Sequence, residues 1–167
     1  MRGVVLAFAL ALFAATPVGA ADLVESAPKP VSIIVQDRDG RDLAPTALGG
    51  RLTLVHFWAS WCGTCRTEFP AIDALQKDMR EEGVRVAAVS LDRLGWPVID
   101  RTATALEIRE VTLLHDRNRE AAQKLAVPGL PTTVVLDATG REVARLVGAG
   151  DWEDESLRAR LRQLAGK

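Results

Sequence analysis

The sequence contains few residues of the kinds that bind metals. Its 167 residues include two cysteines, two histidines and two methionines. A zinc site needs four ligands, so Cys62 and Cys65 would have to recruit both His56 and His115. Two thiolates alone would suit the soft ion Cu(I), but no cluster of methionine or histidine accompanies them. We therefore predict no metal or other cofactor, and keep zinc binding and a Cu(I) metallochaperone as alternatives.

Strong charge of either sign is also absent. The formal net charge is −1, and the lysines and arginines form no basic cluster, which argues against a nucleic-acid partner. A chain of this length with 48% hydrophobic residues suits one domain with a full core. We find no repeat and no second domain, and we expect a monomer.

Residues 1–20 differ from the rest of the chain. Arg2 is their only charge, 4–15 is an almost unbroken apolar run, and small residues precede Ala21. This pattern predicts an export signal, with an uncleaved anchor as the alternative. No cysteine follows the run, which excludes lipid anchoring. We expect a periplasmic or otherwise exported protein, with a polar, proline-bearing and flexible lead-in over 21–30 and a single domain over 31–167.

Both cysteines lie where an apolar run, 52–58, gives way to a predicted helix from residue 62. The first turn of a helix has unpaired N–H groups and the positive end of the dipole, which favour a thiolate. In a C-x-x-C pair the first cysteine can fall in pKa from about 8.5 to ~3.5–7.5. We predict that Cys62 is the nucleophile and Cys65 the buried resolving cysteine. A structural disulfide is the alternative, but so short a loop would add little stability.

Two ionisable residues fall near this pair. Glu68 lies three residues after Cys65 and on the same helix face, where a carboxylate could take the proton of Cys65. Its alternative is a solvent-facing glutamate. His56 lies in the predicted strand, two residues before Trp58, and could relay protons beneath the disulfide. Its alternative is a core histidine with a satisfied hydrogen bond.

A surface for a protein substrate is expected around the nucleophile. Trp61 would offer exposed apolar area, beside Gly63 and Thr64, whereas the other tryptophans are read as packing residues. Leu130 and Pro131 precede a predicted strand. A cis bond between these two residues would fix the backbone for docking an extended segment.

Strand and helix patterns alternate along the rest of the chain, which predicts a mixed α/β fold. The predicted strands and hairpins are 31–35 with 41–43, then 52–58, 84–91, 111–114, 133–136 and 142–147. The predicted helices are 62–82, 98–110, 118–126 with Asn118 as cap, and a last helix capped by Asp151 with Leu157, Leu161 and Leu164 on one face.

The motif Trp61-Cys62-Gly63-Thr64-Cys65, with Glu68 and Pro70 downstream and Leu130-Pro131-Thr132-Thr133 before the last hairpin, resembles the thioredoxin-like superfamily. More narrowly, the chain resembles exported thiol-disulfide oxidoreductases of the TlpA, ResA and DsbE type. The likeness covers about residue 31 to the C-terminus.

This resemblance implies a thioredoxin-like fold with an N-terminal β-hairpin extension, a cis Pro131 facing the disulfide, and catalytic roles for Cys62, Cys65 and Glu68. It also implies reduction of disulfides on specific proteins, of the cytochrome c maturation or copper-site assembly type. A membrane thiol donor of the CcdA or DsbD type would then reduce the cysteine pair again. The family often has Pro at position 64 and Asn or Asp at position 56. These departures leave a thiol oxidase as the alternative direction.

Overall fold

The computed structural model describes residues 20–166. The signal predicted for 1–20 therefore lies almost wholly outside the described residues. The elements occur in the order β1 Val24–Pro30, β2 Val35–Gln36, β3 Asp42–Leu43, η1 Pro45–Leu48, β4 Leu52–Trp58, α1 Gly63–Met79, β5 Val84–Ser90, α2 Trp96–Ala105, β6 Thr112–His115, α3 Glu120–Lys124, β7 Thr132–Asp137, β8 Arg141–Val147 and α4 Glu155–Ala165. None of these helices is both long and apolar enough to cross a membrane.

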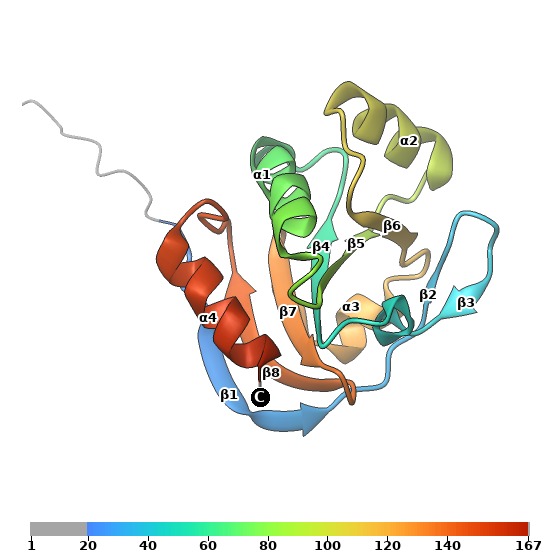
Figure 1. Cartoon of the computed structure of the whole chain (residues 1–167). Coiled ribbons are helices and arrows are strands. Elements are labelled where there is room, and N and C mark those ends of the chain that lie inside the picture. The colour runs from blue at the N-terminus through green and yellow to red at the C-terminus, as the bar shows by residue number, and fades with distance from the viewer. Residues whose placement is uncertain (1–19, 167) are drawn as a thin grey trace, which may run out of the picture.

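The strands form one eight-stranded mixed sheet in the order β1-β8-β7-β4-β5-β6-β2-β3 (Figure 1). β5 pairs in parallel with both β4 and β6, and the other pairs are antiparallel. α1 connects the parallel strands β4 and β5. The predicted α/β architecture, a central mixed sheet flanked by helices, is confirmed.

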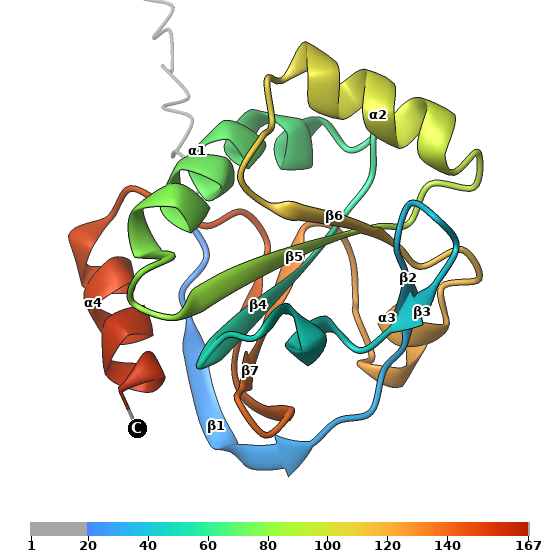
Figure 2. The same cartoon turned by 45° about the vertical axis from the view of Figure 1, so that its right-hand side comes forward.

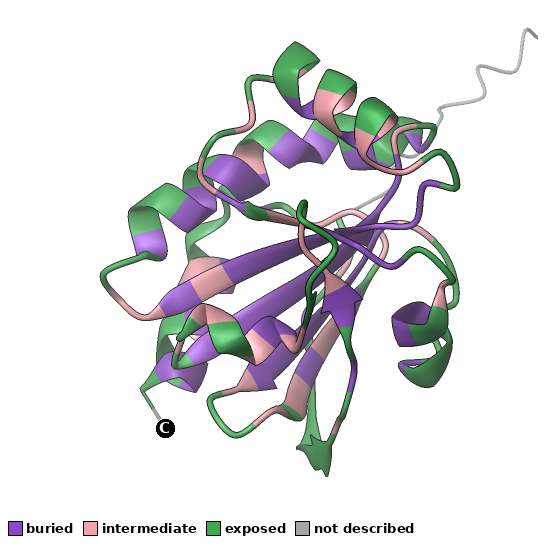
Figure 3. Ribbon diagram, turned by 90° about the vertical axis from the view of Figure 1, so that its right-hand side faces the viewer, coloured by how far each residue is buried: buried purple, intermediate pink, exposed green. Residues whose placement is uncertain are grey.

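β4 is the central strand that leads to the cysteines, and every residue in it is buried. Because side chains alternate along a strand, it contributes to two apolar layers. Leu54 and Trp58 belong to the layer that includes α1 and α4. Val55 and Phe57 belong to the layer that includes α3. Figure 2 shows α1 and α3 on opposite sides of the sheet, and Figure 3 shows the buried central strands between exposed helix surfaces.

The lead-in predicted over 21–30 is corrected by the structure. Val24–Pro30 forms β1, which pairs antiparallel with β8 at the edge of the sheet, with an irregularity between Glu25 and Lys29. Every residue of β1 is exposed. The segment is held through its backbone, so its sequence carries no buried apolar alternation that could have revealed a strand.

The N-terminal hairpin is confirmed, with shorter strands than predicted. β2 and β3 flank a turn in which the N–H of Gly40 donates to the carbonyl of Asp37, and Gly40 has a φ of +79°, which glycine adopts without strain. Gln36 also pairs with His115 of β6. The hairpin thus extends the sheet at the edge opposite β1.

Several helix ends differ from the predictions. α1 ends at Met79 rather than at residue 82, and α2 spans 96–105 rather than 98–110. Asp151 is not the cap of α4: the carboxylate of Asp154 accepts from the N–H of Ser156 and caps the helix. The Asp151 carboxylate instead accepts from the N–H of Glu153 in the preceding turn.

α3 is also shorter than predicted, and Asn118 does not cap it. The residue before its first turn is Arg119, whose side chain makes no capping bond. The buried carboxylate of Asp116 takes this role by accepting from the N–H groups of Ala121 and Ala122. Asn118 is nearer to α3 in the sequence and fits the usual spacing of a helix cap. Asp116, which follows β6, accepts from the N–H groups of the first turn instead.

Candidate functional site

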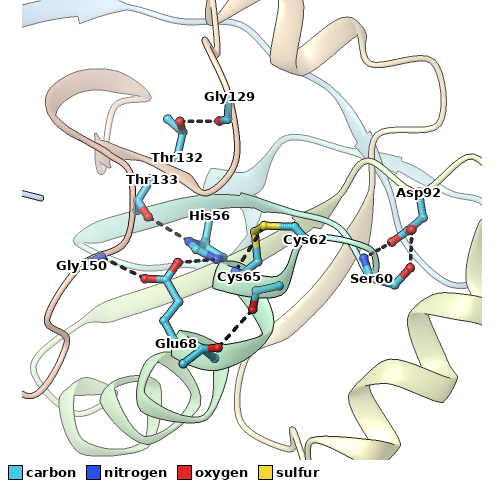
Figure 4. The surroundings of a disulfide bond; sticks show 12 residues. His56, Ser60, Cys62, Cys65, Glu68, Asp92, Gly129, Thr132, Thr133 and Gly150 are labelled. Carbon is cyan, nitrogen blue, oxygen red and sulfur yellow. Dashed lines mark hydrogen bonds and ion pairs between the residues drawn. A yellow bond between two sulfur atoms is a disulfide. The ribbon is translucent and has the colours of Figure 1, made fainter. Parts of the chain in front are cut away.

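The two cysteines lie between the end of β4 and the first turn of α1, and they form a disulfide (Figure 4). Cys62 is the N-cap of α1, and its sulfur accepts a hydrogen bond from the N–H of Cys65 at 3.2 Å. Cys62 is 9% exposed, whereas Cys65 is 0% exposed. Of the two sulfurs, Cys62 is therefore the one that faces the surface, and the helix amide lies where it would stabilise a Cys62 thiolate.

The turn that presents Cys62 is fixed by Asp92, which directly follows the predicted strand 84–91. The Asp92 carboxylate accepts from the N–H of Ser60 at 2.9 Å, from its hydroxyl at 2.6 Å, and from the Ser90 hydroxyl at 2.8 Å. β4 and β5 end side by side, since Trp58 pairs with Ser90. An acidic residue after one parallel strand and a serine after its neighbour was the signal that could have revealed this contact.

Glu68 is buried, so the solvent-facing alternative is wrong. Its Oε2 accepts hydrogen bonds from the N–H of Gly150 at 2.9 Å and from the Trp152 indole at 2.8 Å. Its Oε1 is buried without a hydrogen-bond partner among the described residues. Burial raises the pKa of the Glu68 carboxyl to about 7, although the bonds from Trp152 and Gly150 act in the opposite direction. The carboxyl can therefore give or take a proton near neutral pH.

His56 lies beside Glu68 on the same side of the sheet (Figure 4). Its Nδ1 lies 2.9 Å from the hydroxyl oxygen of Thr133, on the neighbouring strand. Its Nε2 lies 3.8 Å from Oε1 of Glu68 and, within residues 20–166, has no hydrogen-bond partner. Burial lowers the pKa of His56 to about 3. His56 is therefore a neutral imidazole at neutral pH.

A second buried carboxylate on α1 shows what distinguishes Glu68. Asp73 accepts hydrogen bonds from the N–H groups of three consecutive residues, Arg109, Glu110 and Val111. Those bonds satisfy both of its oxygens and tie the segment after α2 to α1. Glu68 instead keeps one oxygen unpaired and directed at His56. A buried polar atom without a partner is rare and calls for an explanation.

The residues predicted to meet a substrate divide between two cavities. Trp61, Cys62 and Leu130 line a cavity of about 490 Å³ together with residues 126–129 and part of α3. Trp61 is 64% exposed. The Leu130–Pro131 bond is cis, and Pro131 itself is buried. The predicted apolar surface beside the nucleophile thus has Trp61 and Leu130 on it.

Thr64 lines another cavity, and its expected role on the substrate surface beside Trp61 stays a prediction. This cavity, of about 730 Å³, is lined by Thr64, Glu68, Trp152 and the loop at 147–151, with Ala20 and Ala21 at its margin. Gly63 is exposed and lines neither cavity. The first turn of α1 separates the two hollows because Cys62 and Thr64 project from it in different directions.

Trp152 and Gly150 are site residues that the sequence analysis missed. Trp152 was read as a packing residue, and it is almost fully buried, but its N–H also bonds Glu68. Both residues are more than 80 positions away from Glu68 in the chain. Among residues 20–166, no group of three or more His, Cys, Asp or Glu side chains is placed to hold a metal ion.

Taken as chemistry, the site offers a surface-facing sulfur, a buried sulfur, and a carboxyl group that titrates near neutrality. Thiol-disulfide exchange needs a thiolate to attack and a second thiolate to resolve the mixed disulfide. Cys62 and Cys65 supply the two sulfurs that this reaction needs.

Comparisons with known proteins agree with this chemistry. The model of the AhpC/TSA family matches residues 26–144. The thiol-disulfide oxidoreductase ResA of Oceanobacillus iheyensis is 29% identical over 114 residues, which cover 68% of this chain and 58% of that protein.

Two solved structures are similar over most of the chain. One is a protein of Chlorobium tepidum assigned as the thiol:disulfide interchange protein DsbE, with a TM-score of 0.70, 24% identity, and 89% and 99% of the two chains covered. The other is the thioredoxin domain of a thiol-disulfide oxidoreductase of Bacteroides vulgatus, with a TM-score of 0.66, 17% identity, and 91% and 99% covered. These likenesses confirm the predicted thioredoxin-like fold.

Proposed function

The chain belongs to the AhpC/TSA family, and from this and the site geometry we propose that it is an exported thiol-disulfide oxidoreductase that reduces protein disulfides. The observation that carries the proposal is the unequal burial of the cysteine pair at the start of α1, with Glu68 buried one turn beyond Cys65. The name of the ResA relative supports the same activity.

In the first step, the Cys62 thiolate attacks one sulfur of a substrate disulfide. A bond forms between Cys62 and that sulfur, and the substrate disulfide breaks, so the other substrate sulfur leaves as a thiolate and takes up a proton. The amide of Cys65 and the start of α1 stabilise the attacking thiolate.

In the second step, Cys65 loses its proton to Glu68 and attacks the Cys62 sulfur. The Cys62–Cys65 disulfide forms, and the remaining substrate sulfur leaves as a thiol after protonation. The substrate gains two electrons and the cysteine pair loses two. Glu68 suits this role because its pKa, about 7, lies near the working pH.

His56 assists by positioning the proton rather than by carrying charge. As a neutral ring it can meet the proton on Glu68 through Nε2 while Nδ1 remains bonded to Thr133. We assign Trp61 and Leu130 to the surface that contacts the substrate backbone and apolar side chains.

The cellular setting is part of the proposal. The N-terminal pattern of residues 1–20 supports export, and a protein with one C-x-x-C pair in an oxidising compartment needs a dedicated source of electrons. A membrane thiol donor of the CcdA or DsbD type would supply them. Disulfides formed during cytochrome c maturation or copper-site assembly are the substrates expected for this type.

Trapping tests the proposal. The Cys65→Ser variant, reduced and mixed with a disulfide-bearing protein such as insulin, should accumulate a mixed disulfide through Cys62, because the resolving sulfur is gone. Cys62→Ser should form none. Absence of an adduct with Cys65→Ser would contradict the proposal.

Equilibration of the cysteine pair with glutathione tests the direction of electron flow. A reduction potential well below about −200 mV fits a reductase, whereas a value near or above about −150 mV would identify a thiol oxidase. The fraction of the pair in the reduced, dithiol form is quantified by alkylation and mass spectrometry.

A further inference from the structure

The cavity beside Cys62 holds one charged side chain. Its lining is otherwise apolar or uncharged, and the charged residue is Arg119, which lies just before α3. Arg119 therefore borders the hollow that a substrate segment would occupy while its disulfide is attacked by Cys62.

Arg119 is unlike the other arginines of the described chain. Most arginine side chains within residues 20–166 hydrogen-bond to a carboxylate or a carbonyl. Six arginines in this range have neither such a bond nor an ion pair. Five of them are exposed, namely Arg66, Arg93, Arg101, Arg109 and Arg117. The sixth is Arg119. Arg119 is half-buried, and its Nε is buried with no hydrogen-bond partner.

An unpaired, partly buried guanidinium has a preferred ligand. Its N–H groups are arranged to donate two parallel bonds to a carboxylate. The apolar walls around it reduce the screening of such a pair. The buried Nε costs free energy while it lacks a partner.

We propose that Arg119 selects substrates: the protein acts on disulfides whose flanking segment carries an acidic side chain that reaches Arg119, beside an apolar side chain that packs on Trp61 and Leu130. The inference rests on the proposed function and adds a specificity-determining residue to it. The occupant is an extended segment of a disulfide-bearing polypeptide, and charge complementarity in an otherwise uncharged groove is the argument for its acidity.

Three cyclic peptides test the inference. They share one sequence and one internal disulfide, and differ only in having Glu, Gln or Lys next to a cysteine. The reduced full-length protein is mixed with each, and the second-order rate constant of its oxidation is measured by acid quench and alkylation. One ion pair is worth up to about 1 kcal/mol, or about fivefold in rate, so we expect the Glu peptide to react about threefold to fivefold faster than the Gln peptide, and the Lys peptide to react slowest.

Substitution assigns the preference to Arg119. In Arg119→Gln the Glu-to-Gln rate ratio should fall to about one, and in Arg119→Glu the order should invert in favour of the Lys peptide. The matched control is Arg117→Gln, an exposed arginine two positions away that lines a different cavity, and it should keep the parent's ratio.

The possible failures are distinguishable. A parent protein that reduces the peptides without preferring Glu, or an Arg119→Gln variant with the parent's ratio, overturns the inference and leaves the proposed function intact. A parent that reduces none of them overturns both. If a second copy of the chain fills the groove, Arg119→Gln will change the sedimentation coefficient and leave the peptide ratio unchanged, which also overturns the inference.

Discussion

His56 Nε2 lies 3.8 Å from Glu68 Oε1, and neither atom has a hydrogen-bond partner among the described residues. The two groups are held in place by their other atoms, since Thr133 bonds the ring and Gly150 and Trp152 bond the carboxyl. A small movement would close the gap into a hydrogen bond. The pair is therefore a part of the site whose bonding can change when Glu68 gains or loses a proton.

Glu68→Gln should slow the resolving step. With Glu68 present, the rate of resolution should rise with pH through about 7, where the carboxyl ionises and can accept the Cys65 proton. Glutamine cannot accept it, so at pH 7 we expect a loss on the order of 100-fold and no inflection near 7. Single-turnover kinetics with a preformed mixed disulfide measure this. The exposed Glu81→Gln serves as control, and an unchanged pH profile in Glu68→Gln would contradict the assigned role.

Glu68→Gln should also change how stability depends on pH. The folded-state pKa of Glu68 lies above its ordinary value of 4.5, so its contribution is full below about 4.5 and is lost as pH rises through about 7. The shift corresponds to roughly 3 kcal/mol. Urea unfolding between pH 4 and 8 should show a smaller decline for Glu68→Gln than for the parent; parallel curves would exclude a raised pKa.

His56→Asn should change how the stability of the fold depends on pH below about 6.5. The folded-state pKa of His56, about 3, lies below its ordinary value of 6.5, so the neutral ring stabilises the fold above 6.5 and that contribution is lost as pH falls toward 3. Asparagine does not titrate. The free energy of unfolding of the variant should therefore fall less between pH 6.5 and 4 than that of the parent, and an equally steep fall would show that His56 is not the group responsible.

Trp152→Phe should move the pH profile of resolution upward. The indole N–H bonded to Glu68 lowers the pKa of the carboxyl, and phenylalanine removes that donor, so the inflection should shift above 7. Loss of one of the two hydrogen bonds to Glu68 Oε2 should also cost about 1–3 kcal/mol of stability. Trp96→Phe, which replaces a tryptophan on α2, is the control for loss of an indole. An inflection that stays at 7 in Trp152→Phe would show that the bond from Trp152 does not lower the pKa of Glu68.

Asp92→Ala should reduce the reactivity of Cys62 indirectly, through the turn at Ser60. The carboxylate holds Ser60 in the turn that leads to Cys62, and a looser turn would align the sulfur less well with the start of α1. We expect slower alkylation of Cys62 at pH 6 and a stability loss of roughly 2–3 kcal/mol. Asp73→Ala removes a comparable buried carboxylate at a distance from the turn, and it should lose stability while keeping the alkylation rate. Equal rates in the two variants would remove the role assigned to Asp92.

Local patterns were sufficient to predict the central elements and the cysteine pair. β4, α1 and β5 carry apolar runs or stripes that fix their faces, and the position of Glu68 one turn after Cys65 follows from the helix period. β1 has no such pattern, because only its backbone is engaged. The partners of Glu68 could not be predicted either, since Gly150 and Trp152 reach it through the packing of the 148–153 loop on α1. Asp92 contacts Ser60 only because β4 and β5 end together.

Cys62 and Glu68 open into different hollows on either side of the first turn of α1. A polypeptide captured on the sulfur would fill one hollow and leave the other open to water. The carboxyl group would then remain in equilibrium with the surrounding medium throughout the covalent stage, so the lifetime of the captured complex should follow external acidity even when the substrate covers the sulfur completely.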